Sequence, residues 1–196
     1  MEKKTTGARE FVASIEAEFR RFQAAGEAAM AQLSDNELLS APEGSNSVAV
    51  IVRHLSGNFL SRFTDFLTTD GEKPWRDRDG EFDDRPIGRT DLLAAWTRGW
   101  DVLLTTLGTL TDADLTRKVR IRGVAFAVHE ALHRALGHAS SHVGQIVFLA
   151  KALRGDGWTC LTIPRGASAT YNQNPALDRP AGHAAALTAQ REKQTP

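Results

Sequence analysis

Four long segments of the chain repeat apolar residues at the spacing of an amphipathic α-helix. They cover residues 8–33, 47–67, 90–110 and 128–153, and glycine or proline lies in each stretch between them. In the first segment the apolar positions are Phe11, Ile15, Phe19 and Phe22. Because such helices bury their apolar faces against one another, the sequence predicts an all-α fold, an antiparallel four-helix bundle.

Two shorter elements are also predicted. Ser34, with Glu37 three residues later, has the pattern of a capping box at the start of a short helical turn. Before the last long helix, Val119 and Ile121 alternate with charged residues, and Gly123 follows them. Alternation at period two that ends at a glycine is typical of a tight hairpin. We therefore expect a small β-hairpin immediately before the last helix.

The chain length and the composition of the C-terminal part predict the domain organisation. A length of 196 residues favours a single domain. After Trp158 the chain gains Pro, Gly, Ser and Asn, which are typical of irregular structure. We expect one domain over residues 1–174 and a disordered tail over residues 175–196. On this interpretation His183 lies in the tail and has no role.

The charge balance argues against two kinds of partner. Lys and Arg together number 24, as do Asp and Glu, so the net charge is zero. A neutral chain lacks the basic excess of a dedicated nucleic-acid binder or of a protein that binds membrane surfaces. No signal peptide is recognisable, no apolar run is long enough to span a bilayer, and Cys160 is the single cysteine. We expect a cytoplasmic protein with neither nucleic acid nor membrane as a partner.

The last predicted helix contains two His-x-x-x-His pairs, His129/His133 and His138/His142. Residues four apart lie on one helix face, so either pair can hold a metal ion. The step from His129 to His138 turns the helix by roughly 180°, so the two pairs face in different directions. The second pair lies closer to the apolar face, whereas the first lies among charged residues and is typical of a solvated face.

A metal site inside a helical bundle takes its ligands from facing helices. His54 is the only histidine of the second predicted helix, and Gln145, which follows His142 by three residues, can donate or accept a hydrogen bond near a ligand. Three neutral imidazoles suit Zn, Ni or Fe(II) and leave coordination positions open. However, His54 lies beside the main apolar stripe, so the pattern alone favours a hydrogen-bonded core or boundary residue at this position.

Two segments resemble the DinB-like (YfiT-like) superfamily of metal-binding helical bundles. One, from Ser45, begins SNSVAVIVRHLSGNF, and the other begins HASSHVGQI. The resemblance covers about residues 11–171 and is to a branch classified as a domain of unknown function. It implies that one histidine of the second helix and two of the last hold a metal ion. In this sequence these ligands are His54, His138 and His142.

The resemblance also implies a function and partners. Some members are transferases or isomerases that depend on bacillithiol or mycothiol, others have no known reaction, and dimers are common. We expect a divalent metal ion (Zn, Ni, Mn or Fe), a homodimer, and a small-molecule thiol or electrophile as partner. The function implied is that of a metal-dependent thiol S-transferase, or a related hydrolase or isomerase. The alternative is a non-catalytic, metal-binding or stress-related dimeric helical protein.

The chain departs from the superfamily pattern at Val143, where many members have arginine. No role of that arginine is therefore carried over, and no residue is assigned as a general base. The predicted hairpin is basic, which fits either an anionic substrate or a solvated strand face. Its basic residues are Arg117, Lys118, Arg120 and Arg122. The acidic loop before the third helix lacks the spacing of a calcium loop. Its acidic residues are Asp77, Asp79, Glu81, Asp83 and Asp84.

Overall fold

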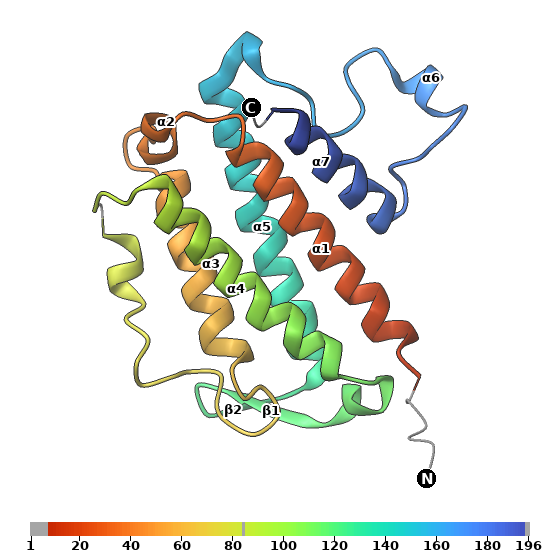
Figure 1. The fold of residues 1–196 in the computed structure, drawn as a ribbon. Helices are drawn as coiled ribbons and strands as arrows, with labels where there is room; N and C mark the ends of the chain where they lie inside the picture. The colour runs from red at the N-terminus through yellow and green to blue at the C-terminus, as the bar shows by residue number, and fades with distance from the viewer. Residues whose placement is uncertain (1–7, 84, 195–196) are drawn as a thin grey trace.

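The computed structural model describes residues 8–83 and 85–194, and most of these residues are helical. Four long helices lie side by side (Figure 1): α1 (Glu10–Met30), α3 (Val48–Phe63), α4 (Arg89–Thr109) and α5 (Val128–Arg154). The shorter helices are α2 (Asp35–Leu39), α6 (Ser168–Tyr171) and α7 (Pro180–Gln194). Three 3-10 turns are η1 (Asp79–Phe82), η2 (Asp112–Thr116) and η3 (Gly155–Gly157). Within the described ranges, no helix combines the length and the apolar content needed to cross a membrane.

Local side-chain chemistry explains where the helices begin and end. The Ser47 hydroxyl accepts a hydrogen bond from the backbone N–H of Val50 and so caps the start of α3. Ser34 and Glu37 form the predicted capping box at the start of α2. At the end of α5, Gly155 has a φ of 50°, which favours glycine. Helix α4 begins at Arg89, and no side chain caps it.

The predicted hairpin is confirmed. Strands β1 (Lys118–Ile121) and β2 (Val124–Ala127) pair antiparallel directly before α5. Arg122 and Gly123 form the two-residue turn with φ values of 56° and 76°, and two positive φ values match the right-handed twist of a hairpin. The backbone N–H of Gly71 donates to the Arg120 carbonyl at 2.8 Å. The hairpin therefore closes the end of the molecule at which α3 finishes (Figure 1).

Helices α3 and α4 run parallel to each other. The Ser56 hydroxyl donates to the carbonyl of Ala95, and further along both helices the Thr106 hydroxyl donates to the carbonyl of Phe63. An antiparallel arrangement is therefore wrong for this pair of neighbours. The physical reason is the connection: residues 64–83 and 85–88, here called the return segment, lead the chain back along α3 before α4 begins (Figure 1).

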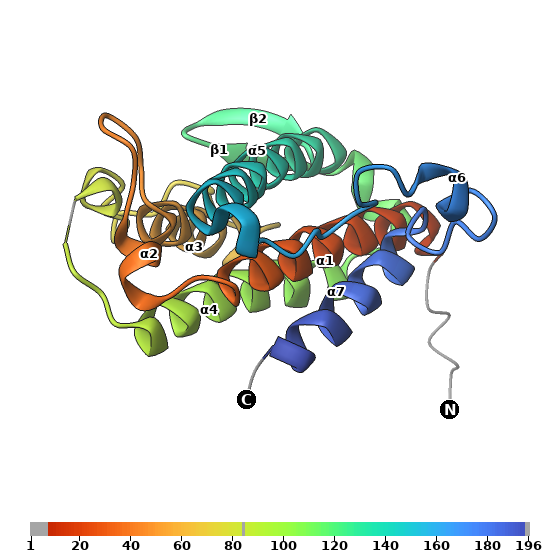
Figure 2. The same cartoon turned by 90° about the horizontal axis from the view of Figure 1, so that it is seen from above.

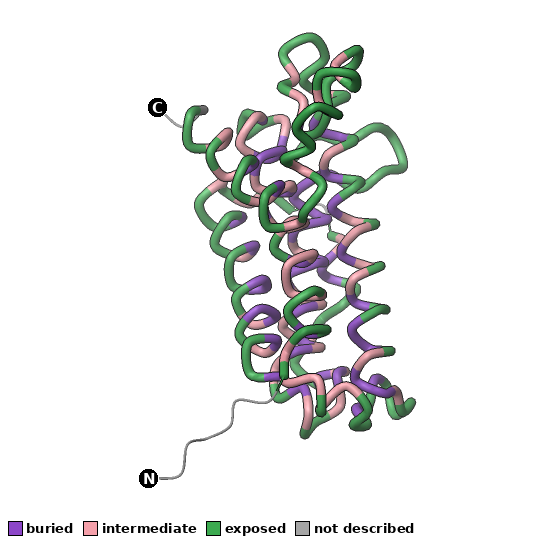
Figure 3. Tube along the Cα trace, turned by 90° about the vertical axis from the view of Figure 1, so that its right-hand side faces the viewer, coloured by how far each residue is buried: buried purple, intermediate pink, exposed green. Residues whose placement is uncertain are grey.

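The core lies among the four long helices and centres on two tryptophans of α4. Trp96 and Trp100 are 2% and 1% exposed, and the ring of Trp100 contacts Phe59 at a centroid distance of 4.9 Å. Gly99 permits close packing, because a Cβ atom there would lie 2.7 Å from the Cα atom of Ser56 on α3. Buried positions recur along each long helix (Figure 3), as the apolar spacing predicts.

Residues 175–194 differ from the disordered tail expected from composition. Helix α7 lies along α1, on the side away from α3 (Figure 2). Leu187 is 1% exposed, and Arg191 pairs with Glu27 of α1. His183, expected to have no role, is buried with its Nε2 2.8 Å from the carbonyl oxygen of Leu161. The average composition of residues 175–194 does not predict this helix, because only a few of its side chains are buried. Residues 195 and 196 lie outside the described residues.

Replacing the buried leucine of α7 tests whether this helix is docked in solution. Leu187→Ala is expected to lower the free energy of unfolding by roughly 2–4 kcal/mol, because it leaves a cavity between α7 and the core. Urea denaturation followed by circular dichroism measures the change. The matched control is Glu192→Ala on the exposed face of α7, which is expected to change stability by less than about 0.5 kcal/mol. Equal stabilities for the two variants would contradict the docked position of α7.

Candidate metal centre

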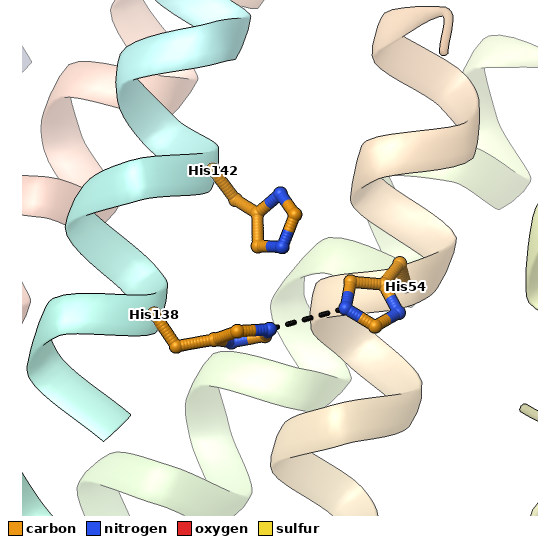
Figure 4. Close-up of side chains that lie close together, drawn as sticks. All are labelled: His54, His138 and His142. Atoms are coloured by element: carbon orange, nitrogen blue, oxygen red, sulfur yellow. Dashed lines mark hydrogen bonds between the residues drawn. The ribbon is translucent and has the colours of Figure 1, made fainter. Parts of the chain in front are cut away.

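His54, His138 and His142 come together between α3 and α5 (Figure 4). One ring nitrogen of each histidine lies within 4.8 Å of the corresponding nitrogens of the other two. The closest pair is Nε2 of His54 and Nε2 of His138, which lie 3.1 Å apart. Among the described residues this is the only group of three His, Cys, Asp or Glu side chains that is close enough to hold one metal ion.

The two helices place these side chains in a simple way. His138 and His142 are one turn apart on α5, so their rings project from the same face, with centroids 4.5 Å apart. His54 faces them from α3 and is 5% exposed, whereas the two histidines of α5 are half-buried. The cluster therefore has a closed side toward α3 and a more open side along α5.

Glu81 of the return segment holds the ring of His54. Its Oε2 lies 2.9 Å from Nδ1 of His54, and Arg76 donates to both carboxylate oxygens at 2.7 and 2.8 Å. Burial alone would raise the pKa of the Glu81 carboxyl, but the hydrogen bonds from His54 and Arg76 outweigh burial and lower it. An ionised Glu81 can only accept, so Nδ1 of His54 carries the hydrogen. The lone pair of a neutral His54 is then on Nε2, which faces the cluster.

Gln145 has the same role for His142. Its side-chain oxygen lies 2.9 Å from Nδ1 of His142, one turn further along α5. With Nδ1 donating to this oxygen, the other nitrogen of His142 points toward His138 and His54 (Figure 4). Burial is the main cause that lowers the pKa of His142, and the Gln145 contact acts in the opposite direction. His142 is thereby favoured in the neutral form, which is the form that binds metals.

Of the three histidines, His138 has the least hydrogen-bond support for its ring. Burial lowers the pKa of His138 to about 3, and the neighbouring His142 and His54 add to the effect. Its Nδ1 is buried and has no hydrogen-bond partner among the residues described. A buried imidazole packed against two others leaves polar atoms unsatisfied, which is costly. Three imidazoles that converge in this way fit a divalent cation, because a cation engages the ring nitrogens that face one another.

Gly57 allows Glu81 to reach the site. It lies one turn after His54 on α3, and a Cβ atom at this position would lie 2.0 Å from Oε1 of Glu81. Sequence reasoning missed this role of Gly57 and considered Glu81 only as part of an acidic loop, whose Asp84 lies outside the described residues. The available signal was a glycine in a helix interior three residues after a candidate ligand, since such a glycine marks a close approach.

The other histidine pair of α5 does not join the cluster. Nδ1 of His129 lies 2.9 Å from the carbonyl oxygen of Leu115, and His133 is exposed to solvent. The two rings lie 6.1 Å apart near the start of the helix, where His129 is half-buried. The structure therefore separates the two His-x-x-x-His pairs as helical geometry predicts.

A cavity of ≈ 270 Å³ adjoins the cluster and opens to solvent. His54 and His138 form part of its wall, and the rings of Phe63 and Phe66 form an apolar part. A small molecule in this cavity therefore lies against both histidines.

Fold and site together define a helical protein with a histidine cluster of the kind that can hold a metal ion. The chain matches the sequence profile of the family described as "Protein of unknown function (DUF1572)" over residues 6–167. Because the match covers most of the chain, the protein belongs to this family. The matched segment includes the whole histidine cluster and ends before α7. No curated protein and no solved structure matches the chain.

A double-mutant cycle tests the close approach of Glu81 to α3. Gly57→Ala is expected to destabilise the parent by roughly 1–3 kcal/mol, because the added methyl group overlaps the Glu81 carboxylate. In a Glu81→Ala background the same substitution is expected to be neutral or stabilising by up to about 1 kcal/mol, since alanine favours a helix. Urea denaturation of the four metal-free proteins gives the coupling.

The control for the cycle is Gly108→Ala on α4, where an added Cβ atom meets open space. This substitution is expected to be neutral or slightly stabilising in both backgrounds. The same cost for Gly57→Ala with and without Glu81 would contradict the proposed contact.

Proposed function

We propose that His54, His138 and His142 bind one divalent metal ion (Zn, Ni, Mn or Fe) and that the protein is a metal-dependent enzyme. The observation that carries this proposal is the support given to the candidate ligands. Glu81 holds the second nitrogen of His54, and Gln145 holds that of His142. Histidines that bind metals almost always donate their second ring N–H to such an acceptor, which sets the tautomer and the ring orientation.

The surroundings favour an enzyme over the non-catalytic alternative. A structural zinc site usually has four protein ligands, whereas a catalytic site has three and keeps a position open. The cluster found among the described residues has three members, and two of them line a cavity. A divalent ion at such a position lowers the pKa of a coordinated water or thiol.

Residues around the cluster fix the position of His54 and shield one side of it from water. Arg76, with a side chain only 2% exposed, holds the Glu81 carboxylate in place against His54. The ring of Phe82 lies 4.7 Å from that of His54, measured between centroids, and so excludes water from one side of the ligand. The chain thereby fixes His54 from two sides and leaves the cavity side accessible.

We further propose that the family is a branch of the DinB-like superfamily, with the four long helices as its four-helix bundle. One histidine on the second long helix and two on the last support this assignment, because the resemblance implies the same distribution of ligands. The proposed reaction is transfer of a small-molecule thiol to an electrophile. The homodimer and the cytoplasmic location stay predictions. Light scattering of the purified protein measures its oligomeric state.

Elemental analysis tests the metal site. Protein purified without a metal-affinity tag and supplied in turn with Zn, Ni, Mn and Fe(II) is expected to hold about one ion per chain. His54→Ala and His142→Ala are each expected to lose this ion, while the control His133→Ala, on the exposed side of α5, retains it. Absence of metal from the parent under all four conditions would refute the site.

The role of Glu81 as a positioning residue is tested by affinity. Glu81→Gln is expected to weaken metal binding by about 10–100-fold, because the neutral amide no longer pairs with Arg76 and holds His54 less firmly. Competition with a chromophoric chelator measures the dissociation constant. The matched control is Asp79→Asn, two residues away with a side chain that is 97% exposed, and it is expected to bind like the parent. Equal affinities for both variants would remove Glu81 from the site.

A further inference from the structure

The cavity beside the histidines is lined by arginines. Six of them form its wall, and no acidic side chain among the described residues does so. They come from four separate parts of the chain, namely α3, the return segment, the hairpin and α5. These arginines are Arg62, Arg76, Arg78, Arg120, Arg122 and Arg134. Four parts of the fold therefore converge on one concentration of positive charge.

Nearby carboxylates neutralise only part of this charge. Glu81 is engaged by Arg76, and Glu72 is shared between Arg62 at 3.2 Å and Arg122 at 2.8 Å. The oxygens of Asp70 accept backbone N–H groups, two of them from the hairpin turn. These three carboxylates are thus already occupied by partners within the fold.

Three arginines keep their charge available to a ligand. Arg78 lies 3.4 Å from Asp79, but this acid is 97% exposed, so the pair is weak. Arg120 donates to the carbonyl of Gly123, and neither Arg120 nor Arg134 forms an ion pair within the described ranges. Guanidinium groups bind carboxylate and phosphate oxygens through paired hydrogen bonds. The positive charge of these three arginines therefore favours the binding of an oxyanion.

Beside the arginines, Asn58 and the two histidines, the wall has an apolar part. Phe63 and Phe66 of the α3 end lie beside Ile121, Ala131 and Ala135. The volume of ≈ 270 Å³ suits a small molecule. A ligand that satisfies both parts of the wall has an apolar body and at least one negatively charged group.

We propose that this cavity binds a small organic anion that carries a carboxylate or phosphate group on an apolar body. The arginines hold the anionic group, and the rest of the molecule lies against His54 and His138. That this ligand is the substrate rests on the proposed function, whereas the binding of the anion does not depend on a metal. Neutral molecules of the same shape are expected to bind more weakly, because they form no charge-assisted hydrogen bonds with the guanidinium groups of the wall.

Nuclear magnetic resonance titration of the ¹⁵N-labelled full chain tests the proposal, with and without added Zn. The probes are 3-phenylpropionate, phenyl phosphate and the neutral amide 3-phenylpropanamide. At least one anion is expected to shift the amide signals of the cavity residues and to bind about tenfold or more tightly than the amide. Arg120→Gln and Arg134→Gln are each expected to weaken anion binding by about tenfold. The control is Arg98→Gln, because Arg98 is an exposed arginine of α4 that does not line the cavity. This variant is expected to bind the anions like the parent.

The outcomes separate this inference from the proposed function. A preference for phenyl phosphate or for 3-phenylpropionate supports the inference and names the anionic group. Equal binding of the amide and both anions, or anion binding that both arginine variants leave unchanged, overturns it. Anion binding by a chain that takes up none of Zn, Ni, Mn and Fe(II) when they are supplied refutes the metal site alone. Metal binding without any effect of the anions refutes the cavity assignment alone.

Discussion

The buried contact among Arg76, Glu81 and His54 is the interaction on which the rest of the site depends. Arg76 and Glu81 are both almost excluded from solvent, and charges in such a place are tolerated only when each has a partner. Arg76 and Glu81 neutralise each other's charge, and Glu81 also fixes the His54 ring. It does so from the return segment rather than from the helices that supply the three histidines. Helix packing alone therefore does not build this site.

The direction of α4 gives the return segment its position. Because α3 and α4 are parallel, the chain has to travel back along α3, and it passes His54 on the way. A short turn between α3 and α4 would have produced antiparallel neighbours and left His54 exposed on that side. The same segment brings Arg76 and Arg78 to the cavity, so the ligand support and part of the cationic wall result from one feature of the topology.

Local sequence signals predicted the local structure and failed where distant segments meet. Apolar spacing, the Ser34 capping box and Gly123 predicted the long helices, α2 and the hairpin, because each depends on neighbours in sequence. The three histidines were named on helix spacing together with a resemblance, and the structure brings them together. The direction of α4, the contact of Glu81 with His54 and the docking of α7 depend on tertiary packing. Local patterns do not name the partners in such contacts. Gly57 indicated a close approach to α3 but not that Glu81 makes it, and Leu187 looked like one apolar residue in a polar tail.

The contact between α7 and α1 has a spectroscopic consequence. Glu27 pairs with Arg191 of α7 through one carboxylate oxygen, and its other oxygen accepts a hydrogen bond from the indole Nε1 of Trp96 at 3.3 Å. Release of α7 would hydrate this carboxylate and change the polarity around a core indole. The fluorescence of Trp96 would then shift with the attachment of a helix that lies beyond the family match, and the protein would have an intrinsic optical reporter of its own C-terminal segment.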